Sequence, residues 1–534
     1  MASDGTSRSG SGGSSPARLG RRGFLGAGLG AAGLTLAACS SAASEPFASA
    51  SGSSSGSPAR LNLHPPAVDP RTQSLIPVPA GRVAAAVRSL DEIIGQLLAA
   101  TGVPGLAASV VHNGDVLYAK GFGVRDIDAG TPVDAKTVFH LASVSKSLSA
   151  TVAAGLVGRK AVQWADPVVS HLPGFGLSVP YVTANVSYGD LFSHRSGLPD
   201  HAGDLLEDLG YDQDYILHAL RLLRLDPFRS TYAYTNFGLT AAAVSAAAAA
   251  RTDWAGAADS VLFGPLGMSA TSFRYSDFLA HADRAAMHVR VDGKWYQKYA
   301  RDADPEAPAG GASSNVLDLA KWMTLKLANG TWLGQPVIDP AALLAADTPG
   351  SVSGLPPTAE ARAGFYGFGT NVGYDYSGRV RLSHSGGFNQ GAATSYFLLP
   401  DQQLGIVVLT NGMPIGVPES VNSYFMDLVV GGKIENDWFA LYEPVFAQMY
   451  VNPSELAGKK PPPHPSPAQP DSFYTGTYHS DFYGTITVTA RGGALHVLMP
   501  PRPTDYPLKH WDGNQFALYP VRSEERRVGK ECRP

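Results

Sequence analysis

Ser143 and Lys146 place a hydroxyl and an amine three residues apart, in the only Ser-x-x-Lys of the chain. Residues three apart on a helix share a face, with roughly 5–6 Å between their Cβ atoms, so an uncharged Lys146 can take the Ser143 proton as acyl transfer begins. The free N–H groups of a first helical turn can hold the oxyanion that forms. Two polar residues on the solvated face of a helix can have the same spacing without any catalytic role. The catalytic interpretation therefore depends on further motifs.

Two further motifs follow along the chain. Tyr234 and Asn236 form a Tyr-x-Asn that can present a phenol and a carboxamide together, although Asn236 could instead cap the alanine-rich helix that follows it. Later, His384-Ser385-Gly386-Gly387 ends a predicted strand. Because glycine has no Cβ, a substrate can lie along this strand edge. We expect the N–H of Gly387 to be the second oxyanion donor, opposite the N–H of Ser143.

The three motifs, in this order, resemble those of the penicillin-recognising serine hydrolases. Within them the chain is similar to the branch of class C β-lactamases, D-aminopeptidases, D-alanyl-D-alanine carboxypeptidases and related esterases. The resemblance covers about residues 83–432 and includes the segments 188–199, 264–268 and 308–314. It implies an α/β (α+β) fold, in which an antiparallel sheet flanked by helices lies beside an all-helical lobe and the active site lies between them.

The resemblance also implies a role for each motif residue. The implied roles are acyl-enzyme formation at Ser143, proton transfer by Lys146 and Tyr234, and substrate binding by Asn236, His384, Ser385 and Gly386. The general base could be either Lys146 or Tyr234. The pKa of a lysine must fall by roughly three units, worth about 4 kcal/mol, before it is a base at neutral pH, whereas Tyr234 could act as a phenolate stabilised by Lys146. The two groups could also titrate as a coupled pair.

The third motif departs from the Lys-Thr-Gly of β-lactamases, because His384 stands where they have lysine. A histidine with a pKa near ~6.5 is mostly neutral at pH 7, so the site lacks a permanent cation suited to a carboxylate. Histidine at this position is familiar in D-aminopeptidases and some carboxypeptidases of this superfamily. Peptidase or esterase activity is therefore favoured over efficient β-lactam turnover, and we expect His384 to hold or protonate a group on the leaving side.

The first 79 residues indicate export rather than structure. Residues 1–39 resemble a twin-arginine signal peptide with a lipobox, Leu36-Ala37-Ala38-Cys39, and residues 40–79 read as a flexible tether. We expect lipidation at Cys39 and an anchor at the cell envelope, on its periplasmic or extracellular face. A core cysteine or an uncleaved anchor helix would be the alternative at this position.

The remaining chain is predicted to hold one enzyme domain and a small C-terminal module. We expect the hydrolase domain at residues 80–435, a helix and Pro-rich linker at 436–470, and a partial lipocalin-like β-barrel at 471–521. Residues 522–534 resemble the translation of a sequencing-library adapter and are expected to be an artefact. Because such a truncated barrel would expose unpaired strand edges, we expect this module to be unstable or disordered.

Periodicity predicts the elements that position the motifs. We expect a helix over 80–100, a hairpin of 106–111 and 116–123 that turns at Asn113-Gly114, and a nucleophile helix that ends at about 158. A mainly helical insertion is expected to follow, up to about 327. After it we expect strands between 380 and 409, a helix over 419–430 and an amphipathic helix over 437–450. His194 and His201 are expected to serve loop packing, since neither has a partner at metal-ligand spacing. Asp190 is expected to be a cap or a buried acceptor.

Composition excludes several other classes. The chain has 534 residues, 44% of them hydrophobic, which is enough for a large core, and its net charge of -4 makes nucleic acid an unexpected partner. No cofactor or metal is implied. We therefore predict an exported, lipid-anchored serine hydrolase of D-residue-containing peptides or amides, with a carboxylesterase or weak β-lactamase as alternatives. A lipoprotein that binds peptidoglycan fragments or β-lactams without turnover is the alternative of another class, and the oligomeric state stays open.

Overall fold

The computed structural model describes residues 74, 76–451 and 454–519. The predicted signal peptide, Cys39, most of the tether and the adapter-like tail lie outside the described residues, so the interpretation of these segments stays a prediction.

A nine-stranded antiparallel sheet forms the centre of the hydrolase domain, in the order β10-β11-β12-β13-β14-β15-β1-β2-β3. Its strands are β1 (Gly105–His112), β2 (Asp115–Asp126), β3 (Thr131–Pro132), β10 (Ser351–Gly354), β11 (Gly364–Tyr366), β12 (Asn371–Tyr374), β13 (Val380–Phe388), β14 (Ala392–Leu399) and β15 (Leu404–Thr410). Strand β1 pairs with β15, so the two ends of the domain meet in the middle of the sheet. Strands β14 and β15 are buried along their whole length, as expected for a sheet covered on both faces.

The β1–β2 hairpin turns where the sequence predicts it. Asn113 and Gly114 both have positive φ angles, 53° and 88°, as a type I′ turn requires. The residue types at these two positions therefore fix the turn, and the register that the turn sets shifts at an irregularity between Val110 and Val111.

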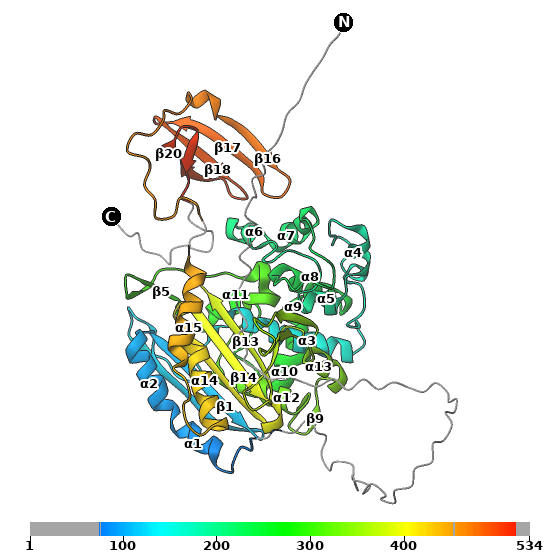
Figure 1. The fold of residues 1–534 in the computed structure, drawn as a ribbon. Coiled ribbons are helices and arrows are strands. Elements are labelled where there is room, and N and C mark those ends of the chain that lie inside the picture. Colours follow the sequence, from blue (N-terminus) through cyan, green and yellow to red (C-terminus); the bar gives the residue numbers. More distant parts are fainter. Residues whose placement is uncertain (1–73, 75, 452–453, 520–534) are drawn as a thin grey trace, which may run out of the picture.

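One face of the sheet is covered by helices from both ends of the domain (Figure 1). These are α1 (Arg82–Arg88), α2 (Leu90–Thr101) and α14 (Val417–Val430), with α15 (Trp438–Ala447) packed outside α14. The single helix predicted over 80–100 is wrong, because it is two helices. The N–H of Ser89 bonds back to the carbonyls of Ala86 and Val87, which ends α1 in a tight turn, and α2 restarts with a new first turn.

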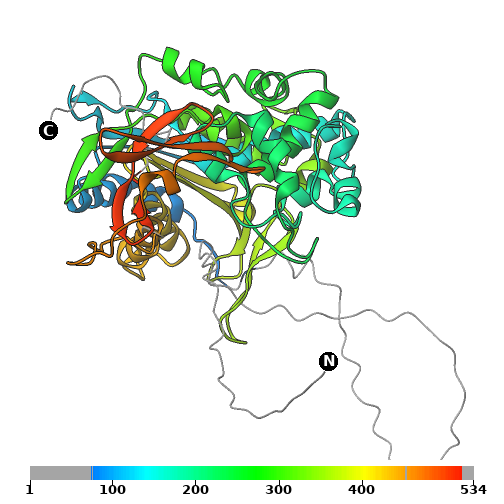
Figure 2. The ribbon, with the colours of Figure 1, turned by 90° about the horizontal axis from the view of Figure 1, so that it is seen from above.

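The other face carries the helical insertion (Figures 1 and 2). Its longer helices are α3 (Ser145–Gly158), α8 (Asn236–Ala249) and α12 (Val316–Leu327), and its shorter ones are α4 (Pro180–Asn185), α5 (Tyr188–Phe192), α6 (Asp204–Leu209), α7 (Gln213–Ala219), α9 (Trp254–Ala258), α10 (Gly264–Leu266), α11 (Tyr275–Ala280) and α13 (Pro340–Ala346). Helix α3 is buried on almost every side. Its serines tolerate this because Ser145, Ser147 and Ser149 bond to the backbone of residues 312, 369 and 308.

The C-terminal module has strands where the sequence predicts them. Strands β16 (Gly476–Ser480), β17 (Gly484–Arg491), β18 (Ala494–Met499) and β19 (Thr504–Pro507) form an open sheet, and β20 (Lys509–Asp512) pairs with β21 (Gln515–Ala517). The module lies near α6 and α7 (Figure 1). There the hydroxyls of Tyr211 and Tyr215 donate to the carbonyls of Tyr483 and Phe482. Residues 471–519 of the expected module thus form paired strands, and one hairpin docks on the helical lobe, so the expected disorder does not hold for them. The expected instability of the module stays a prediction.

Within the described part of the chain, no helix is both long enough and apolar enough to cross a membrane. The same residues contain no group of three or more His, Cys, Asp or Glu placed to hold a metal ion.

Candidate active site

Ser143 lies in a 3₁₀ turn, Ala142–Val144, that leads into α3. The residue before it, Ala142, has a φ of 46°, a left-handed conformation that is costly for a residue with a Cβ. The neighbours Ala142 and Val144 are fully buried, whereas Ser143 is partly exposed. The strained turn thus presents the hydroxyl to the outside while its neighbours anchor it in the core.

The Lys146 amine has three hydrogen-bond partners. Its Nζ lies 3.1 Å from Ser143 Oγ, 2.7 Å from Asn236 Oδ1 and 2.9 Å from the Ala309 carbonyl oxygen. The amide oxygen and the carbonyl can only accept, so both keep their N–H bonds when the amine loses a proton. The lone pair of the neutral amine then points at the Ser143 hydroxyl, which is the geometry that a general base needs.

Burial lowers the pKa of Lys146 to about 8, and the carboxylates of Glu306, Asp204 and Glu207 limit this fall. The side chain is fully buried. A buried ion cluster supplies two of these carboxylates, since Arg301 Nη2 lies 2.9 Å from Glu207 and 3.0 Å from Glu306. A lysine with a pKa near 8 is partly neutral under mildly alkaline conditions, so the amine can act as a base without a further activating group.

The Tyr234 ring lies over the same amine, with Lys146 Nζ 4.6 Å from the ring centroid. Burial raises the pKa of the Tyr234 phenol well above 10, and a hydrogen bond with Ser143 only partly offsets this. The phenol is therefore protonated where the amine is already partly neutral. Of the two candidate bases, the electrostatics favour Lys146, and Tyr234 is placed to pass a proton between Ser143 and a leaving group.

Asn236 contacts Lys146 and does not cap its helix. Thr235 is the N-cap residue of α8, and its side chain makes no capping hydrogen bond. The Asn236 amide nitrogen lies 3.3 Å from Asp204 Oδ2, and Asp204 in turn lies 2.7 Å from His201 Nδ1. This contact raises the pKa of His201. The expectation that His201 serves loop packing is therefore wrong, because its ring is largely exposed and paired with a carboxylate of the site.

The third motif lies at the end of β13, beyond the residues 380–383 that pair with β12. A Cβ on Gly386 would lie 2.2 Å from the Leu141 carbonyl oxygen and 2.9 Å from Ser143 N, so only glycine lets the strand pack against the nucleophile turn. Side chains alternate along a strand, and Ser385 therefore points to the opposite face, where its hydroxyl lies 3.4 Å from Ser395 Oγ. Gly387 is partly exposed beside the turn, and its role as an oxyanion donor stays a prediction.

His384 is buried and both of its ring nitrogens are occupied. Nδ1 lies 2.7 Å from the Ser385 carbonyl oxygen and Nε2 lies 2.8 Å from Tyr366 Oη. Because the carbonyl can only accept, Nδ1 carries the proton and Nε2 accepts from the Tyr366 hydroxyl. Burial, together with the Lys146 charge, lowers the pKa of His384 to about 3. The ring is thus neutral, and it has no free nitrogen with which to protonate a leaving group in this arrangement.

We expect His384→Gln to leave the acid limb of the pH–rate profile where the wild type has it. A group with a pKa of about 3 does not titrate between pH 5 and 9, so its removal changes the plateau but not the limb. The measurement is kcat/KM over that range for both proteins. If the acid limb moves in His384→Gln, His384 takes part in the proton transfers.

Two further sequence expectations can be checked. His194 is buried and its ring contacts those of Tyr234 and Tyr366, so the packing interpretation is confirmed, although its Nδ1 also accepts from Thr235 N. Asp190 is confirmed as a cap and a buried acceptor, since it forms a capping box with Ser187. Tyr366, Glu306, Arg301 and the Ala309 carbonyl also belong to the site, and they are not predicted from the sequence; of these, only Ala309 lies in a segment of the resemblance, 308–314.

The chain is similar to known proteins along most of its length. The family model described as Beta-lactamase matches residues 90–431, and a domain of unknown function, DUF3471, matches residues 460–528. The second match includes part of the stretch that resembles an adapter. A curated relative, the unguisins hydrolase ungD of Aspergillus violaceofuscus, is 27% identical over 432 residues, which cover 74% of this chain and 75% of the relative.

Solved structures show the same fold. The octameric penicillin-binding protein homologue from Pyrococcus abyssi superposes with a TM-score of 0.57 at 20% identity and covers 83% of this chain and 94% of its own. A class C β-lactamase from Rhodobacter sphaeroides gives a TM-score of 0.51 at 22% identity and covers 65% of this chain and 98% of its own. The family match spans more than half of the chain and includes all three motifs. The chain therefore belongs to the β-lactamase family of serine hydrolases.

Proposed function

We propose that this protein hydrolyses amides or esters through an acyl-enzyme on Ser143, with Lys146 as the general base. The observation that carries the proposal is the arrangement around the Lys146 amine, in which two obligate acceptors hold its N–H groups and the third position faces the Ser143 hydroxyl. Lys146 takes the hydroxyl proton while Ser143 Oγ bonds to the substrate carbonyl carbon. The backbone N–H groups of Ser143 and Gly387 then hold the oxyanion.

The second half of the reaction uses the same groups. Tyr234 passes the proton to the departing amine or alcohol as the bond from the carbonyl carbon breaks. Water then attacks the acyl carbon while Lys146 takes one of its protons. The bond from the acyl carbon to Ser143 Oγ breaks, Lys146 returns the proton to that oxygen, and the acid leaves. The position of Tyr234 over the Lys146 amine supports this shared proton path.

The charges around the site favour a substrate without a carboxylate near the scissile bond. His384 is neutral, and Arg301 is held between Glu207 and Glu306. The carboxylate of Asp204, 26% exposed, and that of Asp200, 54% exposed, lie on the same side of the site as Tyr234. A neutral or amine-bearing acyl group suits these surroundings, whereas a penicillin carboxylate does not. Peptides or amides with D-residues fit this class, and the histidine of the third motif supports them by resemblance.

A screen of the purified protein tests the proposal. It compares p-nitroanilides of L- and D-amino acids with p-nitrophenyl esters, with Ser143→Ala as the control that removes the nucleophile. Turnover of D-anilides in preference to L-anilides supports the peptidase. Turnover of esters alone supports the carboxylesterase alternative, and turnover of a β-lactam but neither of these supports the weak β-lactamase.

A non-catalytic binding lipoprotein is distinguished by covalent labelling. A fluorophosphonate followed by intact mass should add one adduct, on Ser143, and none in Ser143→Ala. A pure binder should neither be labelled nor turn over an activated ester. The accessible hydroxyl and the Lys146 contacts argue for the enzyme.

We also propose export with a lipid anchor at Cys39, supported by the twin-arginine-like segment and the lipobox. The test is fractionation of cells that express the full chain. Wild type should partition with membranes, and Cys39→Ser should not.

A further inference from the structure

Asp190 accepts hydrogen bonds from two arginines of different loops, more than a helix cap requires. Its side chain is fully buried, and Ser187 already satisfies it through the capping box at the start of α5. In addition, Arg195 Nε lies 2.8 Å from Oδ1, and Arg229 Nη2 lies 2.8 Å from Oδ2. Burial alone would raise the pKa of Asp190, but these hydrogen bonds hold it below the usual range. The carboxylate therefore stays charged and bonded to both loops.

The two arginines belong to loops that pair along their backbones. Arg195 lies in the segment 194–201, and Arg229 lies in the segment 226–235, which carries Tyr234. Four backbone hydrogen bonds join these segments: Asp226 N to Gly197 O, Arg229 N to Arg195 O, Ala233 N to His194 O and His201 N to Tyr234 O. A fifth bond runs from Thr235 N to Nδ1 of the His194 ring. The position of Tyr234 is thus set by how the second loop lies on the first.

Both loops contain residues with strained backbone angles, which need stabilising contacts. His194, His201 and Arg229 have φ angles of 56°, 57° and 64°, in the left-handed region that non-glycine residues avoid. Such conformations persist only where the surrounding contacts over-determine them. Arg229 meets this condition, because its guanidinium also donates to the Asn185 carbonyl while its N–H bonds to Arg195.

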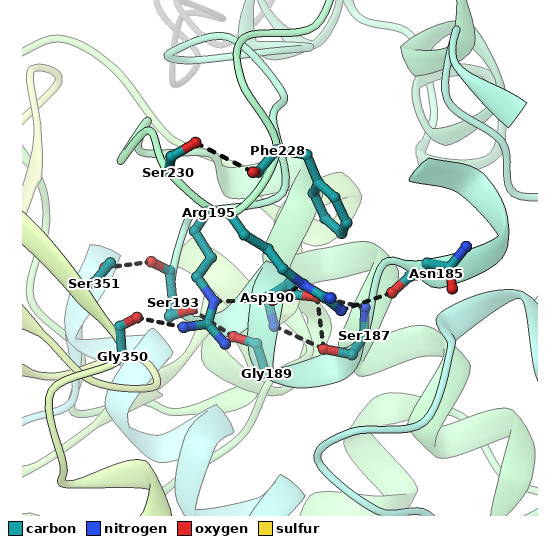
Figure 3. A network of polar contacts seen from close by, with 11 residues as sticks. Asn185, Ser187, Gly189, Asp190, Ser193, Arg195, Phe228, Ser230, Gly350 and Ser351 are labelled. Carbon is teal, nitrogen blue, oxygen red and sulfur yellow. Dashed lines mark hydrogen bonds and ion pairs between the residues drawn. The ribbon is translucent and has the colours of Figure 1, made fainter. Parts of the chain in front are cut away.

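The contacts extend to the sheet that carries His384. Arg195 Nη1 donates to the Gly350 carbonyl at 2.6 Å, and the Ser351 hydroxyl donates to the Ser193 carbonyl at 2.7 Å (Figure 3). Residue 351 begins β10, which pairs with β11, and β11 ends in the Tyr366 that holds His384. Asp190 thus joins α5, the Tyr234 loop and the edge of the sheet.

We propose that Asp190, Arg195 and Arg229 form a clamp that positions Tyr234 over the Lys146 amine for proton transfer. The proposal rests on the proposed acyl-enzyme function. The three residues act through Tyr234 and are positioning residues, since none of them contacts Ser143 or Lys146 in the hydrogen bonds that define the site. Misplacing a catalytic group by about an ångström costs up to about a hundredfold in rate, so a loop displacement of this size is measurable.

The test uses Arg229→Gln, which removes one arginine and leaves Asp190 paired with Arg195. Arg274→Gln is the matched control, because Arg274 also pairs with carboxylates, Asp253 and Asp259, and is 38% exposed against 49% for Arg229. For a p-nitrophenyl ester, kcat is expected to fall about ten- to hundredfold in Arg229→Gln with KM changed less than about threefold, and to stay at the wild-type value in the control. A clamp that only stabilises the fold would lower the melting temperature and leave kcat unchanged.

Hydrogen exchange gives a readout that needs no turnover. Peptides that span 194–201 and 226–236 should exchange faster in Arg229→Gln and unchanged in Arg274→Gln. If wild type fails to turn over any ester, the proposed function fails, but the exchange still decides whether the clamp holds the loop. Unchanged exchange and unchanged kcat would overturn the clamp. If Arg229→Gln does not fold, Arg229→Lys carries the same two measurements, with an intermediate effect expected because an ammonium cannot match both carboxylate oxygens.

Discussion

Replacing Lys146 with arginine is expected to lower kcat/KM for an activated ester by about a hundredfold to ten-thousandfold, the range lost when a general base is removed. Arginine keeps the positive charge but does not give up its proton at any working pH. The amine is fully buried among Ser143, Asn236 and the Ala309 carbonyl. The other group bonded to Ser143, the Tyr234 phenol, has its pKa raised well above 10 by burial, so it stays protonated and does not replace the amine as a base. Lys146→Met, which keeps the length without the charge, should lose as much activity as Lys146→Arg.

The pH dependence separates the two candidate bases. Because the pKa of Lys146 is lowered to about 8, the fraction of neutral amine rises as pH rises through that value, and kcat/KM should rise with it. The phenol of Tyr234 has its pKa raised well above 10 and does not ionise in this range. Tyr234→Phe should therefore lower the plateau and keep the limb near pH 8. A limb that disappears in Tyr234→Phe would make the phenolate the base.

Ser143→Ala is the reference for both substitutions, because it removes the nucleophile itself. If Lys146→Arg retains much more activity than Ser143→Ala and the limb near pH 8 persists in it, the amine is not the group that takes the hydroxyl proton.

The parts of the site that sequence could predict are those with local spacing. Ser143 and Lys146 are three positions apart, and the turn into α3 places their polar atoms 3.1 Å from one another. The order of the motifs then placed Tyr234, Asn236 and Gly386 near them. The Asn113-Gly114 turn was predictable for the same reason, since a two-residue turn needs positive φ at both positions.

The parts that sequence could not predict come from long-range contacts without a residue signature. The Ala309 carbonyl that holds Lys146 is a backbone atom 163 residues away, and any residue type could supply it. Tyr366 contacts His384 because β11, β12 and β13 are neighbouring strands of the sheet, and this strand order is not visible in the sequence. The break between α1 and α2 at Ser89 could not be predicted for another reason. The apolar spacing continues through it, and a single tight turn does not change the periodicity.

Glu419 gives the second large expected effect, on stability rather than on rate. It lies in the first turn of α14 on the far side of β13 from Ser143, and only 4% of it is exposed. Burial raises its pKa to about 7 from an ordinary 4.5, and the nearby Ser385 hydroxyl only partly offsets this. Neither carboxylate oxygen makes a hydrogen bond of good geometry among the described residues, although the Ser385 hydroxyl lies nearby, and both amide atoms of Asn422, one turn further on, also lack one. The folded protein therefore prefers the neutral acid.

The sign of the pH dependence follows from linkage. A carboxyl whose pKa is higher in the folded state contributes stability that is fully present below pH 4.5 and is lost as pH rises through about 7. The loss amounts to about 3 kcal/mol at most when it is complete. Glutamine keeps the shape and cannot ionise, so Glu419→Gln should be close to wild type in stability at pH 5, where most of this contribution is still present, and clearly the more stable protein at pH 8.5.

Urea unfolding at the two pH values measures this difference, with Glu92→Gln as the control. Glu92 is an exposed glutamate of α2 whose side chain contacts Gln96, so its substitution should change stability little at either pH. The decisive quantity is the change in unfolding free energy of Glu419→Gln between pH 5 and 8.5, relative to the change in wild type. If the two proteins lose stability in parallel, the Glu419 carboxyl is hydrated. Helix α14 would then not seal the back of the strand that carries the third motif, and the packing behind Ser385 would be looser than described.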